Sequence, residues 1–321
     1  MDNIATFCRR REFLPAVFFC LLLALNPPLW GAEADGPVVF CSYNLKNWLL
    51  SPRPGDAAEA PPQPKPEKEK AKVISTLTEI RPDILGVCEI GSLDDLKELQ
   101  SRLKQAGIDL PHLEHSKGVD ATRSLGLLSR FPIVSRHSQS LLEYQIGETT
   151  FGMQRGILDV AVDVRPDCQI RFVGVHLKSK RPIPEADEAL MRRNEAHLLR
   201  GHLDKIFAAD AEAKVLCYGD FNEHRNEPAI SEIIGPRASP GYMSDLFLRD
   251  SHGLVWTHFW DAADVYGRLD YLFASRALRP WLDSRKSYIH TDKDFYKASD
   301  HRPIVTTLAG QRKSSAAAGQ N

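Results

Sequence analysis

The sequence of 321 residues has little cysteine, and its six cysteines include no CxxC pair. A structural zinc site built on paired thiolates is therefore not predicted. Cys41, Cys88 and Cys217 each lie inside a short apolar run, which predicts small core residues on strands. An oxidising compartment would permit a disulfide, but no spacing here requires one.

The chain also lacks an excess of charge of one sign. Its 41 Lys and Arg residues and 42 Asp and Glu residues leave a formal net charge of -1. No long-range field should therefore attract a polyanion, and any affinity for nucleic acid has to come from a local patch. With 43% hydrophobic and 26% charged residues, the composition is that of a globular protein with a substantial core.

Apolar runs long enough to cross a bilayer, about 20 residues, are lacking as well. The run from Phe13 to Leu25 has 13 residues, follows the arginines at 9–11 and precedes Pro27 and the small residues that end at Ala34. This pattern predicts a secretory signal peptide, residues 1–34, and a secreted or periplasmic mature protein. A membrane anchor is the alternative, and the pair Arg10-Arg11 also resembles a twin-arginine export signal.

What the sequence does contain is an interleaved series of helices and strands. Strands are expected at 37–44, 84–88, 124–130, 133–142, 151–164, 170–176, 214–218, near 255, and at 268–274 and 303–308, with helices from 67 to Pro82, from 93 to Gly107 and over 185–207. Residues 51–71 are rich in proline and predict a solvated insertion loop, and 310–321 predict a disordered tail. Polar residues repeatedly follow the carboxyl end of an apolar strand, which places them on one rim of a sheet.

Glu89 is a lone carboxylate directly after the apolar strand at 84–88. An unpaired charge so close to the core is costly, which favours a bound cation. Mg²⁺ binds few protein carboxylates together with water and phosphate oxygens, and Asn44, at the end of another strand, can add an amide oxygen. The alternative is a glutamate at a strand end that caps the next helix.

Three further segments carry candidate catalytic residues. Asp220 and Asn222 follow an apolar strand and Gly219, and their i, i+2 spacing faces them to the same side. Asp270 lies within an apolar run, and Asp300 and His301 are adjacent; a carboxylate beside a histidine fixes its tautomer and favours the imidazolium. An Asx turn at 220 and a surface turn at 300 are the alternatives.

Basic side chains follow His176, namely Lys178, Lys180 and Arg181, and Arg155 can add a contact to phosphate. A solvated run of charges is the alternative. The aromatic residues Trp48, Trp256, Phe259 and Trp260 are suited to stacking on bases, but the sequence does not place them in space. A nuclease and an enzyme acting on smaller phosphate esters are left equally open.

Taken together, these segments resemble the endonuclease/exonuclease/phosphatase superfamily, which includes pancreatic-type deoxyribonucleases, apurinic endonucleases, neutral sphingomyelinases and inositol polyphosphate phosphatases. The resemblance rests on Asn44-Leu45, Glu89, Ser129-Arg130-Phe131-Pro132, His176-Leu177, Gly219-Asp220-Phe221-Asn222, Arg268-Leu269-Asp270-Tyr271 and Ser299-Asp300-His301, in order from residue 38 to residue 308. It implies an α/β fold, a four-layer sandwich of two mixed β-sheets flanked by helices, as a single domain over 35–309, and we expect a monomer.

The resemblance also implies roles. Glu89 and Asn44 bind a divalent metal, Mg²⁺ with Mn²⁺ or Ca²⁺ as alternatives, and Asp300 is a further ligand. Asp220 and Asn222 position or deprotonate the attacking water, Asp270 orients His301, and His301 and His176 contact the scissile phosphate. A catalytically inactive binding module of the same fold is the second hypothesis. A glycoside hydrolase with paired carboxylates would leave the turns at 220 and 300 unexplained.

Overall fold

The computed structural model describes residues 36–51, 61–166 and 168–309. The expected signal peptide, the tail at 310–321 and residues 52–60 of the proline-rich segment lie outside this range. The described residues belong to one compact unit. None of the helices within that range is both long and apolar enough to cross a membrane.

Two six-stranded mixed sheets form the centre of the fold. The first has the order β15 (Leu282–Ile289), β16 (Ile304–Leu308), β1 (Val38–Trp48), β2 (Ile84–Ile90), β4 (Ser124–Ser129), β3 (His112–Ser116). The second has the order β11 (Met243–Asp245), β14 (Asp270–Ser275), β10 (Val215–Asp220), β9 (Cys168–His176), β8 (Leu158–Arg165), β5 (Ile133–Arg136). β1 runs parallel to β2 and β9 runs parallel to β10, whereas the other pairs are antiparallel.

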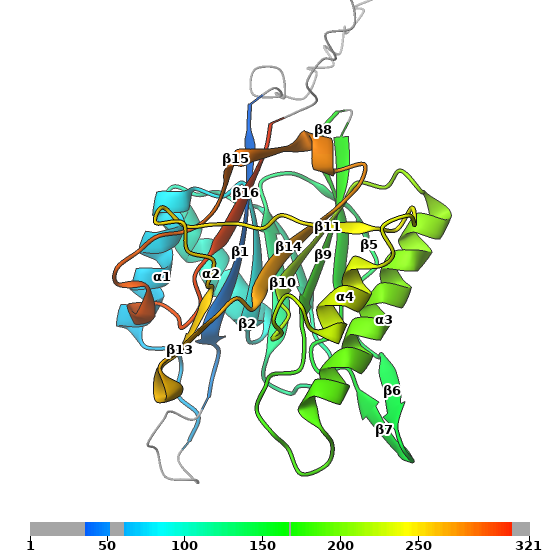
Figure 1. The fold of residues 1–321 in the computed structure, drawn as a ribbon. Helices are drawn as coiled ribbons and strands as arrows, with labels where there is room; N and C mark the ends of the chain where they lie inside the picture. The colour runs from blue at the N-terminus through cyan, green and yellow to red at the C-terminus, as the bar shows by residue number, and fades with distance from the viewer. Residues whose placement is uncertain (1–35, 52–60, 167, 310–321) are drawn as a thin grey trace, which may run out of the picture. The chain divides into compact units, whose positions relative to one another are not determined.

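Helices cover the outer face of each sheet. Figure 1 shows α1 (Glu67–Ile80) and α2 (Leu93–Gln105) on one side and α3 (Glu188–Ala209) and α4 (Pro228–Ile234) on the other. Three apolar clusters fill the interfaces: α1 and α2 against the first sheet, sheet against sheet, and the second sheet against α3 and α4. The expected four-layer α/β sandwich is confirmed.

Local signals explain several boundaries. The Ser92 hydroxyl accepts from the backbone N–H of Asp95, whose carboxylate accepts from the N–H of Ser92, so the predicted capping box begins α2. Gly107 follows that helix in the left-handed region, with φ +82°. Cys41, Cys88 and Cys217 are free, buried thiols, as expected for core residues on strands, and Cys168 is buried as well.

Other expectations were wrong. The helix expected from residue 67 is confirmed as α1, so the expected loop at 51–71 extends too far by residues 67–71; the buried Lys70 ammonium in this stretch binds Glu98 on α2, 2.7 Å away. The expected strand at 133–142 ends at Arg136, and the one at 151–164 is divided between β7 (Thr149–Gly152), which pairs with β6 (Glu143–Ile146), and β8. No strand forms at Val255; a short hairpin follows instead, β12 (His258–Trp260) with β13 (Val265–Gly267).

Candidate active site

Strand directions bring the candidate residues to one edge of both sheets. Two pairs of parallel strands end there, β1 with β2 and β9 with β10. Asn44, Glu89, His176 and Asp220 lie at or near the ends of these strands. β14 and β16 run the opposite way, so their first residues lie at the same edge. In register, Asp220 pairs with His176 on one side and with Asp270 on the other. Asp300 and His301 come just before β16.

Asp220 is at the centre of this arrangement and is 1% exposed. Its Oδ2 atom accepts a hydrogen bond from the Asn44 amide at 3.0 Å. The same oxygen lies 3.5 Å from His176 Nε2 and 3.6 Å from His301 Nε2. Its Oδ1 atom accepts from the backbone N–H of Asn222 at 2.9 Å, which closes the turn after β10. The carboxylate is therefore surrounded by nitrogen atoms from both sheets.

The two histidines differ in charge. His301 donates from Nδ1 to Asp270 Oδ2 at 2.8 Å. Burial alone would lower the pKa of His301, but the charges of Asp270 and then Asp220 outweigh it and raise the pKa to about 10. Burial, together with the positive charges of Arg155 and His301, lowers the pKa of His176. At neutral pH, His301 is thus an imidazolium and His176 a neutral ring.

Burial raises the pKa of the Asp220 carboxyl, and the positive charge of His301 opposes this only in part. Asp270 and Glu89 act in the same direction as burial because they are also negative. A carboxylate whose pKa moves toward neutrality is a better proton acceptor at neutral pH. The environment therefore suits Asp220 to take a proton from a water molecule.

Backbone conformation at the site is unusual. Glu89 has φ 58° and Asn222 has φ 50°, in the left-handed region that residues other than glycine rarely adopt. Such conformations are retained at functional sites when the surrounding structure imposes them. Here, the Glu89 carboxylate accepts from the backbone N–H of Asn47 at 3.0 Å, and the Asn222 amide donates to the Leu177 carbonyl at 3.0 Å.

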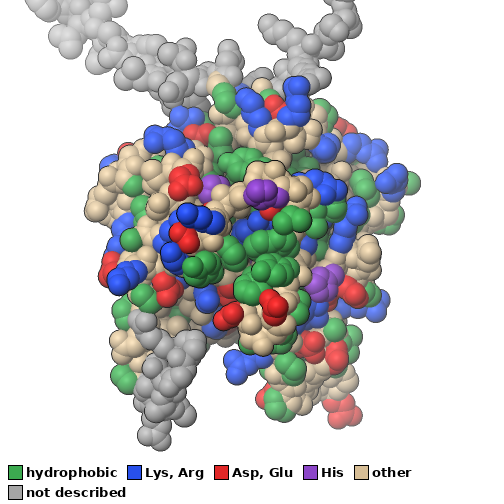
Figure 2. Space-filling model, turned by 60° about the vertical axis from the view of Figure 1, so that its left-hand side comes forward, with side chains coloured by type: hydrophobic (Ala, Val, Ile, Leu, Met, Phe, Trp, Pro, Cys, Tyr) green, Lys and Arg blue, Asp and Glu red, His purple; other side chains and the backbone are tan. Residues whose placement is uncertain are grey.

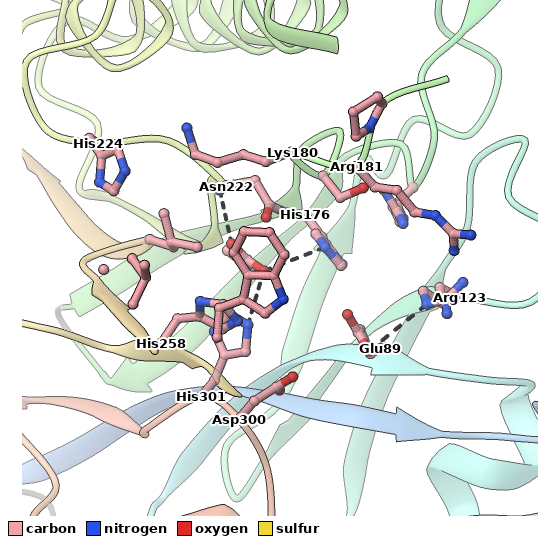
Figure 3. Close-up of a pocket in the computed structure, with 18 residues that line it drawn as sticks. Glu89, Arg123, His176, Lys180, Arg181, Asn222, His224, His258, Asp300 and His301 are labelled. Carbon is pink, nitrogen blue, oxygen red and sulfur yellow. Dashed lines mark hydrogen bonds and ion pairs between the residues drawn. The ribbon is translucent and has the colours of Figure 1, made fainter. Parts of the chain in front are cut away.

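Glu89 and Asp300 offer carboxylate oxygens to a cation along the edge of the first sheet (Figure 3). The Asn44 side chain differs from its expected orientation: its oxygen accepts from the backbone N–H of Lys46 at 3.0 Å, and its nitrogen faces Glu89 at 3.3 Å. Two carboxylates attract an N–H donor, which explains the orientation. The Asn44 amide would therefore have to rotate, so that its oxygen takes the place of its nitrogen, before it could bind a metal.

Asp220, Asp270 and His301 form another compact set of ligand types, with ligand atoms within 4.8 Å of one another. We infer that these three side chains take part in proton transfer rather than in binding a metal. His301 Nδ1 is already bonded to Asp270, and a protonated ring has no lone pair for a cation. Glu89 and Asp300 offer the hard oxygen donors that a divalent cation prefers.

One wall of the pocket is cationic. Arg155 is 6% exposed and lines the pocket, and its Nη2 lies 3.3 Å from Asp120. Its buried Nε and Nη1 atoms have no hydrogen-bond partner. Figure 3 shows Arg123 and Arg181 on the same side of the pocket, opposite His224 and His258. Buried guanidinium donors without partners are suited to an anion.

Lys178 differs from the expected phosphate contact. Its ammonium donates to the backbone carbonyls of Ser179 at 3.0 Å and Arg181 at 2.8 Å, so it braces the loop after β9. Lys180 does line the pocket, where its ammonium binds Glu223 at 2.5 Å. Glu223 also accepts from Arg192 at 2.8 Å.

Arg123, His224 and His258 line the pocket but were not expected from the sequence. Arg123 directly precedes β4, which runs antiparallel to β2 with Ser124 opposite Ile90. Its position beside Glu89 therefore follows from strand pairing, which no local motif reveals. His258 lies on β12, and its ring centroid is 4.5 Å from that of His301.

The pocket is a cavity of about 610 Å³, within the range of small-molecule sites. On the face drawn in Figure 2, acidic and basic side chains are interspersed, in keeping with the small net charge. The concentration of positive charge at the pocket wall is thus local.

The model of the Endonuclease/Exonuclease/phosphatase family matches residues 55–301. By sequence alone, no curated protein matches. Among solved structures, the human Nocturnin catalytic domain with bound sulfate anion aligns with a TM-score of 0.60 at 17% identity, over 84% of this chain and 93% of that one. Sphingomyelinase C from Streptomyces griseocarneus aligns with a TM-score of 0.58 at 14% identity, over 85% and 99%. Truncated TDP2 from Caenorhabditis elegans aligns at 0.54 and 17%, over 86% and 99%. At these identities, the structural likeness shows a shared fold.

Proposed function

Because the chain belongs to the Endonuclease/Exonuclease/phosphatase family, we propose that it is a divalent-metal-dependent hydrolase of phosphate esters. The observation that carries the proposal is the buried Asp220 carboxylate, held between Asn44, His176 and His301 at the floor of a pocket with a cationic wall. This arrangement places a proton acceptor beside donors that suit a phosphate group.

In the proposed mechanism, Asp220 accepts a proton from the water that attacks phosphorus in line with the leaving oxygen, and Asn222 holds that water or a phosphate oxygen. The bond from phosphorus to the leaving oxygen breaks as the new bond forms, and the leaving group departs as an alcohol or phenol after it gains a proton from solvent. His301, as an imidazolium fixed by Asp270, stabilises the negative charge that develops on the phosphate, and neutral His176 donates a hydrogen bond to it. Arg155 and Arg123 orient the anion through their guanidinium donors. No covalent enzyme intermediate is required.

Glu89 and Asp300 would hold the cation, Mg²⁺ with Mn²⁺ or Ca²⁺ as alternatives, and Asn44 would join them once its amide oxygen faces the site. A bound divalent cation supplies charge neutralisation at the phosphate oxygens. Glu89 supports this assignment because, apart from the Arg123 guanidinium 3.9 Å away, its contacts are neutral N–H donors. The protein therefore provides Glu89 with little compensating positive charge, which suits it to bind a cation.

The test is hydrolysis of methyl p-nitrophenyl phosphate by the full chain, with and without Mg²⁺. We expect activity that depends on the metal, is lost in a chelator and is lost in Glu89→Ala, while the fold survives. Asp94→Asn is a control, because Asp94 is an exposed carboxylate on α2. Full activity of Glu89→Ala, or of the chelated protein, would refute the metal assignment.

We also propose that the protein is exported and monomeric, with residues 1–34 as a cleaved leader. The support is the charged and then apolar pattern of the N-terminal sequence. Expression with the leader in a bacterium should yield a protein that begins after Ala34 and lies outside the cytoplasm, with the mass of a single chain in solution. Full-length protein in the membrane fraction would favour an anchor.

A further inference from the structure

A second cavity, of about 420 Å³, lies beside the catalytic pocket. Four aromatic side chains line it, Phe259, Tyr266, Phe295 and Tyr296, together with Lys46 and Lys293. Asp300 lines both cavities, so they meet at this proposed metal ligand. A molecule bound at the catalytic pocket can therefore extend past Asp300 into the second cavity.

The hairpin of β12 and β13 is the partition between the two cavities. Side chains alternate along a strand, and the two linings follow that alternation. His258 and Trp260 face the catalytic pocket, whereas Phe259 between them faces the second cavity. On β13, Val265 faces the catalytic pocket and Tyr266 faces the second cavity.

The partition is tied to the catalytic segment. The backbone N–H of Phe259 donates to the Asp300 carbonyl at 2.9 Å. The backbone N–H of Arg302 donates to the Thr257 carbonyl at 2.7 Å. The Thr257 hydroxyl in turn accepts from the N–H of Asp270 at 3.0 Å. The aromatic cavity is thus held at a fixed position relative to Asp270, Asp300 and His301.

The rings are arranged for stacking. Phe259 and Tyr266 stack with centroids 4.4 Å apart at 26°. Trp256 braces Tyr266 edge-on at 4.8 Å and Phe295 at 5.2 Å. Tyr266 and Tyr296 are nevertheless 54% and 58% exposed. Large rings held firmly but open to solvent offer a flat face to a ligand.

Charged groups surround these rings. Among the described residues, Lys293 and Asp261, both at the cavity, have no ion-pair partner, and Lys46 approaches only Asp300, at 3.9 Å. An acyl chain would leave such groups without a partner, whereas a nucleobase has N–H and carbonyl groups on its edge and a phosphate beside it.

Resting on the phosphoesterase function proposed above, we propose that this cavity is a nucleobase subsite, and that the substrate is a phosphodiester with a nucleoside next to the scissile phosphate. The base stacks on the exposed ring of Tyr266, which Phe259 supports from behind, and Lys46 or Lys293 contacts a flanking phosphate. This separates a nucleotide substrate from sugar phosphates and lipids, which have no planar group at that place.

The test is equilibrium binding by calorimetry in a chelator, so that hydrolysis does not interfere. The probes are thymidine 3′,5′-bisphosphate and the tetrahydrofuran 3′,5′-bisphosphate that lacks the base. We expect the base to improve Kd on the order of tenfold in the wild type. Tyr266→Leu, and separately Phe259→Leu, should reduce that preference to about twofold or less. Tyr288→Leu, on β15 and away from the cavity, is the matched control and should keep the preference.

Equal affinity of the wild type for both probes would overturn the subsite, and so would an unchanged preference in both variants. Binding of phosphatidylcholine vesicles that Tyr266→Leu abolishes, without a preference for the base, would make the cavity a membrane contact instead. Hydrolysis of methyl p-nitrophenyl phosphate, measured in parallel, keeps the two proposals apart. Its absence refutes the phosphoesterase function, whereas a missing base preference refutes only the subsite.

Discussion

At the scale of single residues, Asp220 is the group whose chemistry depends most on its surroundings. Asp220→Asn keeps the shape of the side chain and one of its two acceptor oxygens, so it can accept either from Asn44 or from the Asn222 N–H, but it removes the proton acceptor. We expect kcat to fall on the order of a hundredfold or more, with little change in KM. Steady-state kinetics on methyl p-nitrophenyl phosphate measure this, and nearly normal turnover would show that Asp220 is not the base.

Asp270 acts on the reaction through His301 rather than on the substrate, because it lies behind the ring and does not line the pocket. If it fixes the tautomer and the charge of the ring, Asp270→Asn should cause most of the loss that His301→Ala causes. The double variant should then be little slower than either single variant, since residues that act as a unit are not additive. A double variant slowed by the product of both losses would contradict the pairing.

At the scale of elements, the end of β10 depends on Gly219. This residue has φ +133°, and a Cβ atom there would lie 1.9 Å from the Val175 carbonyl oxygen on β9. The turn that aims Asp220 and Asn222 into the pocket thus requires the close approach of two backbones, which only glycine permits.

Gly219→Ala should therefore destabilise the fold by about 3 kcal/mol, from the clash and the backbone strain together. Urea unfolding measures the loss. Gly201→Ala is the matched control, because the added methyl group on α3 would meet no atom within 4 Å other than those of its chain neighbours and the local helix backbone, and there alanine should stabilise by about 0.5–1 kcal/mol. A Gly219 variant as stable as the wild type would show that β9 and β10 can separate without cost.

The same elements explain what the sequence could predict. Apolar strands followed at once by a polar residue, such as Glu89 and Asp220, gave the correct edge of the sheets because parallel strands end together. Arg123 was missed because it precedes an antiparallel strand. It lies beside Glu89 only because β4 pairs with β2, and no local motif shows that pairing. β15 was missed because its exposed residues, Arg285 and Lys286 among them, conceal the period of the strand. Lys178 was wrongly expected to contact phosphate. Its ammonium binds backbone carbonyls of the loop instead, and a sequence motif does not show such contacts.

At the scale of the whole molecule, one buried ion cluster joins three elements across two layers. Asp159 on β8 is fully buried and accepts two bonds of 2.6 Å from Arg171 on β9. It also accepts from His202 on α3 at 2.5 Å. The cluster therefore holds the outer helix against the second sheet.

Asp159→Asn should lower the free energy of unfolding at pH 7 by about 3 kcal/mol, because it leaves the Arg171 charge without its partner. Burial alone would raise the pKa of Asp159, but the bonds from His202 and Arg171 outweigh it and hold the pKa below its ordinary value. A depressed pKa contributes stability that is complete above the unfolded value of about 3.9 and is lost as the pH falls through the folded value. The wild type and the variant should thus differ most near neutrality and converge in acid.

Urea unfolding of the wild type and of Asp159→Asn at pH 7 and at pH 3 measures how much free energy the variant loses at each pH. Asp163→Asn, four residues along β8, is the control, because Asp163 is only partly buried and accepts from the exposed Gln169 amide at 2.9 Å. It should change stability by less than about 0.5 kcal/mol at either pH. An Asp159 variant that loses the same free energy at both pH values would assign the effect to packing. In that case the charge of Asp159 would not be what holds α3 to the sheet.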